Sequence, residues 1–237
     1  MQESRFPDWG QFEFVDLTYA YEEGMPVWPT HPHYFQNRWE HYENGFYFNQ
    51  ITLGEHNGTH IDAPGHFIQE GPAHYFIEQM DIRRFFGRAC IVDACRDFGE
   101  QYRLTVQQLR EWEAAHEPIQ AQDMVFIRFG MDRKYALAPD HQDFIQRWGG
   151  VSPEAAQYLA DKGISVVGTD ALSIDIYGNP NSAAHQIFLG NEIYVIENLV
   201  NLDQLPSVVS VVALPLKLKG GSGAPVRVVA LVEKKKS

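Results

Sequence analysis

Hydrophobic residues are distributed along the chain in two patterns that predict different elements. Short apolar runs without helical spacing predict strands, whereas apolar residues that recur on one helical face predict helices. The expected strands cover residues 12–18, 46–53, 88–94, 124–129, 164–168, 193–197, 207–214 and 226–232.

Three segments between these strands have the spacing or the boundary residues of helices. Residues 105–115 place their apolar side chains on one face, and a second helix is expected within 140–148. The third has Ser152 as its cap, Pro153 in the first turn and Gly163 after the last turn. These signals predict helices in the middle of the chain and few at its ends.

Strands separated by helices predict an α/β fold with a mixed central sheet, parallel in the middle and antiparallel where helices are scarce. The polar stretch 169–191 is expected to be a long loop. No linker interrupts the chain, so residues 1–237 are predicted to form a single domain. In such sheets ligands bind at the carboxyl ends of the strands, where His56 and Glu197 can converge.

Composition excludes several classes of partner. The chain has 44% hydrophobic and 13% aromatic residues, which favours a folded globule, and its net charge of −12 disfavours binding to nucleic acid or to anionic membranes. No apolar run reaches membrane-spanning length, so a soluble, cytoplasmic protein is expected. Cys90 and Cys95 have no redox or zinc-finger spacing, and Cys90 is predicted to be a core thiol.

The strongest chemical signal is a cluster of three histidines and one aspartate: His56, His60, Asp62 and His66. These side chains bind divalent metals through nitrogen and oxygen. Neighbouring glycine and proline residues disfavour a helix here and favour an irregular or extended backbone. In an extended segment His60 and Asp62 point to the same side, where both can hold one ion, whereas His66 follows a Pro-Gly turn and need not join them.

Two further candidates are ambiguous from the residues alone. His185 and Glu197 could form a metal pair, but a histidine and a glutamate at that separation also occur by chance. Trp28 lies between two prolines and is equally compatible with a core position and with the wall of a pocket. His31 and His33 lie in the same loop and receive no role.

The motif His56-x-Gly58-Thr59-His60-x-Asp62-x-Pro64-x-His66 resembles the signature of the putative cyclase family of metal-dependent hydrolases. Its members include bacterial kynurenine formamidases (arylformamidases) and isatin hydrolases. Four other segments resemble parts of the same family, so the resemblance extends over about residues 12–232. They lie at residues 26–29, 168–175, 196–199 and 213–227.

The resemblance implies a swivelling β/β/α fold, a homodimer or homotetramer, and a site with one or two divalent ions, Zn²⁺ or Mn²⁺. It implies His66 as the catalytic residue and Trp28 as a substrate-binding residue. A carboxylate at position 197 favours the two-metal, formamidase-like branch of the family. The metal ligands it implies are His56, His60, Asp62, His185 and Glu197.

The function implied is hydrolysis of a small aryl formamide resembling N-formylkynurenine, as in tryptophan catabolism, by metal-activated water with His66 as general acid and base. An isatin-type lactam, or another small amide or ester, is the alternative substrate. A non-catalytic protein that binds a small aromatic molecule through a metal is the alternative of another class. Two departures from the family pattern, at Thr30-His31 and in the long aromatic segment 35–46, are expected to fall at the substrate walls.

Overall fold

The computed structural model describes residues 8–95 and 102–234, and a mixed sheet of eight strands forms its centre. Four of these strands, namely β5, β7, β9 and β10, run parallel to one another, and the other four are antiparallel to their neighbours. The strands are β1 (Phe12–Asp16), β4 (His60–Asp62), β5 (Phe86–Asp93), β7 (Met124–Arg128), β9 (Val166–Thr169), β10 (Tyr194–Glu197), β11 (Val208–Pro215) and β12 (Gly223–Glu233). The predicted α/β fold with a mixed sheet is confirmed.

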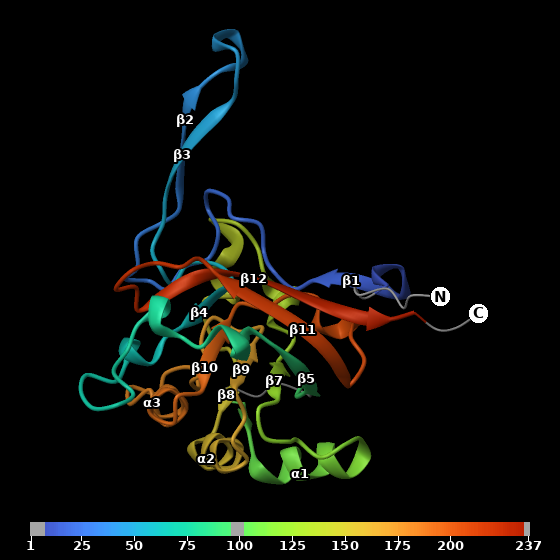
Figure 1. The fold of residues 1–237 in the computed structure, drawn as a ribbon. Coiled ribbons are helices and arrows are strands. Elements are labelled where there is room, and N and C mark those ends of the chain that lie inside the picture. The colour runs from blue at the N-terminus through green and yellow to red at the C-terminus, as the bar shows by residue number, and fades with distance from the viewer. Residues whose placement is uncertain (1–7, 96–101, 235–237) are drawn as a thin grey trace.

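The sheet closes on itself because β12 pairs with β4 in addition to its neighbours β1 and β11. The spatial order is β1-β12-β11-β5-β7-β9-β10-β4, and the first residues of β12 also pair with β4 (Figure 1). The long β12 therefore contacts β4 near its beginning and β1 near its end. This closure places β4 between β10 and β12, two strands that lie far from it in the sequence.

Three α-helices lie on the same side of the sheet (Figure 1): α1 (Val106–Ala115), α2 (Pro153–Asp161) and α3 (Ala183–Gly190). The Thr105 hydroxyl accepts from the Gln108 N–H to start α1, and the Ser152 hydroxyl accepts from the Ala155 N–H to start α2. Gly163 follows α2 with a φ of 71°, a left-handed conformation that suits glycine. The first and third predicted helices are thus confirmed.

Two sequence predictions are wrong in detail. Residues 140–148 contain a 3-10 helix, Asp140–Asp143, in place of an α-helix, and the left-handed φ of 59° at Arg147 is incompatible with a helix that continues to residue 148. The stretch 169–191 is not loop throughout, because it contains α3. The Asp175 carboxylate accepts from the Ala184 N–H at 2.7 Å and caps α3 from outside the helix. The residue just before α3 makes no capping hydrogen bond with its side chain, so the cap is not a local one.

The sheet separates two apolar cores, one inside the barrel and one beneath the helices. Phe126 on β7 packs inside the barrel, whereas its neighbours Val125 and Ile127 pack against the helices. Because both faces of these strands are buried, their sequences are continuously apolar. In the described part of the chain, no helix combines the length and apolarity that a membrane span requires.

A separate two-stranded hairpin, β2 (Phe35–Glu40) and β3 (Phe48–Thr52), projects from the body of the molecule (Figure 1). We call it the arm. It carries several exposed aromatic side chains, including Trp39 at 63% and Tyr42 at 79% exposure. A small additional sheet pairs β6 (Arg103–Leu104) with β8 (Gly150–Val151).

Candidate metal centre and active site

Strand β4 places His60 and Asp62 side by side. As alternate residues of a strand they point to the same side, and the His60 Nε2 lies 3.4 Å from the Asp62 Oδ1. The other ring nitrogen of His60, Nδ1, hydrogen-bonds to the Gly58 carbonyl at 2.9 Å and so fixes the ring. The expectation of an extended backbone with both side chains on one side is confirmed.

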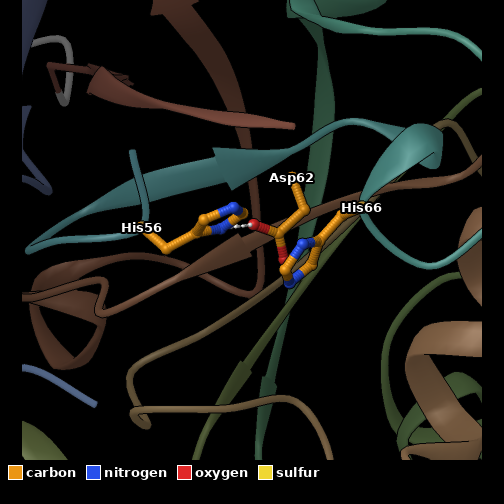
Figure 2. Close-up of side chains that lie close together, drawn as sticks. All are labelled: His56, Asp62 and His66. Atoms are coloured by element: carbon orange, nitrogen blue, oxygen red, sulfur yellow. Dashed lines mark hydrogen bonds and ion pairs between the residues drawn. The ribbon is translucent and has the colours of Figure 1, made fainter. Parts of the chain in front are cut away.

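His56 reaches the same carboxylate from the turn before β4. Its Nδ1 lies 2.7 Å from the Asp62 Oδ1 (Figure 2). Its Nε2 lies 2.9 Å from the Ser222 hydroxyl. The ring packs directly on Gly223, where an added Cβ would lie 2.4 Å from a ring carbon. The start of β12 therefore determines where His56 can lie.

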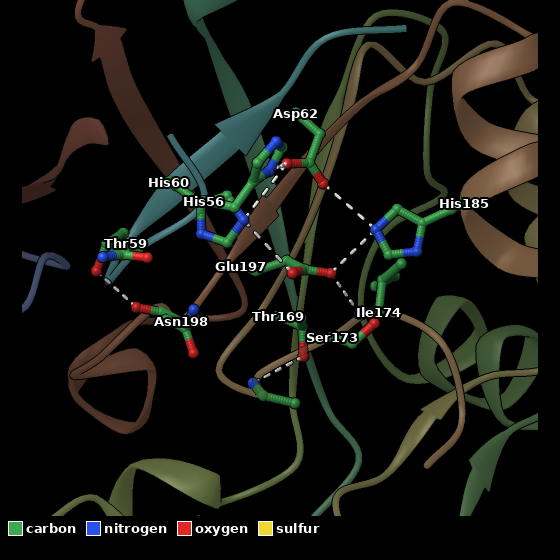
Figure 3. A network of polar contacts seen from close by, with 12 residues as sticks. His56, Thr59, His60, Asp62, Thr169, Ser173, Ile174, His185, Glu197 and Asn198 are labelled. Atoms are coloured by element: carbon green, nitrogen blue, oxygen red, sulfur yellow. Dashed lines mark hydrogen bonds and ion pairs between the residues drawn. The ribbon is translucent and has the colours of Figure 1, made fainter. Parts of the chain in front are cut away.

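His185 and Glu197 come from distant parts of the chain and meet at Asp62. Glu197 ends β10 opposite His60, and its Oε1 lies 3.2 Å from the His185 Nε2 (Figure 3). The same nitrogen lies 3.3 Å from the Asp62 Oδ2. The structure thus brings the five predicted metal ligands together, with Asp62 facing two groups of side chains.

Asp175, to which the sequence assigned no role, fixes His185. Its Oδ2 lies 2.5 Å from the His185 Nδ1, so the Nε2 faces Asp62 and Glu197. A histidine held by a carboxylate in this way is typical of metal ligands. No local pattern links residues 175 and 185, and only the tertiary structure reveals the pair.

The buried carboxylates favour positive charge at this centre. Burial opposes charge on His185, but hydrogen bonds to Asp175, Asp62 and Glu197 outweigh it and raise its pKa well above the usual value. Burial likewise opposes charge on Asp62, but His56 and His60 hold its pKa well below its usual range. Metal ions are stabilised by the same surroundings.

Two sets of side chains have donor atoms close enough to hold an ion. The donor atoms of each set lie within 4.8 Å of one another. One set is His60, Asp62 and Glu197, and the other is His56, Asp62 and His66. Nitrogen and carboxylate donors without cysteine suit zinc or manganese. The residues present therefore fit one or two divalent ions.

His66 differs from His56, His60 and His185 in having no partner among the described residues for its ring nitrogens. It ends the 3-10 helix Pro64–His66, and its ring stacks on His56 with centroids 4.0 Å apart (Figure 2). Burial lowers the pKa of His66 to about 4, so the ring is neutral at pH 7. A neutral imidazole beside Asp62 can accept a proton from a bound molecule.

The centre lies in a cavity of about 340 Å³ with aromatic walls. Trp28, Phe67 and Trp148 line it, and the rings of Trp28 and Trp148 meet edge to face with centroids 5.7 Å apart. Trp28 is 39% exposed, so it is a wall residue and not a core residue. Trp148, which the sequence analysis missed, donates its indole N–H to the Asp175 carbonyl at 2.8 Å.

Of the two segments expected at the substrate walls, only one is there. His31 lines the cavity, whereas no residue of the aromatic segment Phe35 to Phe48 does. That segment forms most of the arm, because its strands pair with each other and not with the central sheet. The expectation for residues 35–46 is therefore wrong.

A family model described as Putative cyclase matches residues 15–176. The chain belongs to the putative cyclase family. It is 29% identical to an isatin hydrolase of Roseibium aggregatum, over 95% of this chain and 94% of that protein. It is 28% identical to a kynurenine formamidase of Erythrobacter litoralis, over 90% of this chain and 91% of that protein.

Solved structures of cyclase-family proteins have the same fold. An isatin hydrolase bound to the product analogue thioisatinate aligns with a TM-score of 0.88 and 28% identity, covering 95% of this chain and 94% of that one. A potential metal-dependent hydrolase with cyclase activity aligns with a TM-score of 0.74 and 28% identity, covering 94% of this chain and all of that one. The relatives of this cyclase-family chain are thus metal-dependent hydrolases and enzymes acting on small aromatic compounds.

Proposed function

We propose that this protein is a metal-dependent hydrolase that cleaves the C–N bond of a small aryl formamide, of the N-formylkynurenine type. One observation carries the proposal: His66, neutral and without a described partner for its ring nitrogens, lines an aromatic cavity next to His56, Asp62 and the other predicted metal ligands. A site for binding alone does not need a free proton acceptor at that position. The similarity to kynurenine formamidases supports the same chemistry.

Five side chains would hold the metal, with Asp62 shared between two ions. A divalent ion, when bound, makes water more acidic and draws electron density from a carbonyl oxygen. Asp175 keeps His185 turned toward Asp62 and Glu197 throughout. Zinc and manganese both suit these donors.

His66 moves the proton in this proposal. Its free ring nitrogen accepts a proton from the attacking water and then donates it to the departing amide nitrogen, which leaves as an aniline. Trp28, Phe67 and Trp148 hold the aromatic ring of the substrate and exclude water around the scissile bond. The products are formate and the aryl amine.

A lactam of the isatin type is the second candidate substrate. The TM-score of 0.88 to an isatin hydrolase, against 0.74 to the other metal-dependent hydrolase, specifically favours it. The residues that would hold the metal and move the proton are the same for both reactions. A non-catalytic metal-dependent binding protein is the alternative of another class, and turnover of any substrate rejects it.

We also propose that residues 1–237 form one domain and that the protein assembles as a homodimer. Strands from both ends of the sequence, β1 and β12, pair in the same sheet, which supports the single domain. The exposed aromatic residues of the arm support self-association, since exposed apolar patches mark interaction sites. Light scattering on the purified protein measures the mass of the assembly.

The test begins with metal analysis of protein purified without added metal. Turnover of N-formylkynurenine, isatin and formanilide is then measured on the same sample. His66→Ala should lower kcat by about 10² to 10⁴-fold, because it removes the proton carrier, while the metal content stays unchanged. Loss of metal in this variant would instead make His66 a ligand.

A further inference from the structure

His31 stands beside the metal centre but is outside both donor sets. Its backbone N–H donates to the Trp28 carbonyl at 2.9 Å, a turn that holds the two side chains together. The His31 ring lies 6.5 Å from the Trp28 ring and 6.0 Å from the His56 ring, measured between centroids. His31 therefore lies next to a metal-donor histidine, on the side of the cavity that Trp28 covers.

The ring nitrogens of His31 have no hydrogen-bond partner among the described residues. The ring is tilted against those of Trp28 and His56, with interplanar angles of 44° and 48°. Burial, together with His56 and His60, lowers the pKa of His31 below its usual value. An imidazole ring carries at least one N–H donor in either protonation state, and His31 lines the cavity where a bound molecule could accept from it.

Apart from the predicted metal ligands and His66, the cavity has few polar side chains. No described residue lining it is lysine or arginine, and the aromatic walls offer no charged group. The polar residues Ser173, Asn179 and Ser182 come from the segment that carries Asp175, next to α3. His31 is the polar lining residue that the turn to Trp28 holds beside the aromatic wall.

We propose that His31 determines specificity: its N–H donates to an uncharged acceptor, such as a carbonyl, ortho to the scissile amide on the aromatic ring of the substrate. An ortho substituent lies on the ring carbon next to the one that bears the amide, so both groups can reach neighbouring parts of one small site. The metal donors and His66 would hold the amide, and His31 would hold the ortho group. This inference rests on the proposed hydrolysis of aryl amides.

Two substrates with the same scissile bond test it: 2′-formamidoacetophenone, which has an ortho carbonyl, and formanilide, which lacks one. The ratio of their kcat/KM values is compared between the wild type and variants, so that intrinsic reactivity cancels. His31→Phe keeps a ring but removes the donor, and should lower the ratio by about 5- to 10-fold, the usual effect of one neutral hydrogen bond.

His31→Gln is the matched control because it retains an N–H donor, and it should restore part of the ratio. An equal loss on both substrates, or no loss, would overturn the role of His31. The metal content of each variant should equal that of the wild type. A loss of metal would place His31 in the metal centre and would also overturn its role in specificity.

The role of His31 can be tested even if the proposed hydrolysis is wrong. If the wild type hydrolyses neither substrate, calorimetry on the metal-loaded protein compares the binding of 2-aminoacetophenone and aniline. Weaker binding of 2-aminoacetophenone alone in His31→Phe, with His31→Gln near the wild type, supports the role of His31 in binding. Equal effects on both ligands reject it.

Discussion

Asp62 presents its two carboxylate oxygens to different partners. Oδ1 faces His56 and His60, whereas Oδ2 faces His185. Glu197 also faces both groups, because its Oε2 lies 3.6 Å from the His60 Nε2 and its Oε1 lies 3.2 Å from the His185 Nε2. These two carboxylates would allow the centre to hold two ions. This arrangement leads to the prediction that each chain binds two ions.

Glu197→Gln is expected to remove one ion per chain. The amide has nearly the same shape and its oxygen can still accept from the Ile174 N–H, as Glu197 does at 2.8 Å, so the fold should persist. The negative charge that stabilises the second ion is lost. Elemental analysis against protein concentration measures the stoichiometry, and an unchanged value would defeat the two-metal version of the site.

Asn198→Gly is expected to weaken metal binding by about 10-fold or more, as loss of groups that orient ligands usually does. The Asn198 amide donates to the Gly58 carbonyl at 2.9 Å, and that carbonyl also accepts from the His60 ring. Glycine suits this position because φ is 57°. Competition with a chelating dye gives the affinity, and a drop in stability without a change in affinity would show a purely structural role.

Strand β12 affects the metal centre through a glycine. An added Cβ at Gly223 would lie 2.4 Å from the His56 ring, so Gly223→Ala should displace that ring from Asp62 and lower metal affinity. Gly87→Ala on β5 is the control, because its Cβ would make only ordinary contact, 3.7 Å from Met124. Chelator titrations of both variants measure the effect, and equal affinities would contradict it.

The elements differ in how well the sequence predicts them. Strands buried on both faces have continuous apolar runs, and α2 has its cap, its proline and its final glycine in the sequence, so local residues were sufficient. The start of α3 depends on Asp175, eight positions before the helix, and short-range signals could not show it. The turn around Arg147 likewise depends on a backbone conformation that periodicity does not report.

The same contrast applies to the site. His56, His60, Asp62 and His66 are close in the sequence and were visible as a cluster. His185 and Glu197 were weak candidates until the family resemblance supported them, because folding alone joins them to Asp62. Three contributors received no role from the sequence, since their partners are distant in the chain: Asp175, Trp148 and Ser222. Asp175 and Ser222 lie in segments that resemble the family, but the resemblance did not single them out.

At the scale of the whole molecule, the buried Asp170 should make stability depend on pH. It accepts from the N–H groups of Phe129, Gly130 and Met131, yet burial raises its pKa to about 7. Between about pH 4 and pH 7 the folded protein keeps a proton that the unfolded chain releases. The contribution of Asp170 to the free energy of unfolding should therefore be largest at about pH 4 and below, and fall by about 4 kcal/mol as the pH rises to 8.

Urea unfolding of the metal-free protein at several pH values measures this slope. Asp170→Asn is the reference, because its amide does not titrate, and the difference between the two proteins isolates the contribution of Asp170. The variant should be less stable at pH 4, since its amide nitrogen cannot accept from the backbone N–H groups. Parallel pH profiles for the two proteins would contradict the prediction.

The pairing of β4 with β12 has a consequence for biosynthesis. His60 lies opposite Pro225 in this pairing, and Ser222, just before β12, contacts His56. During translation the metal-binding histidines of the first cluster leave the ribosome long before the strand that completes their surroundings. We expect a nascent chain that stops before β12 to bind metal weakly, so that the cofactor enters only when synthesis is nearly finished.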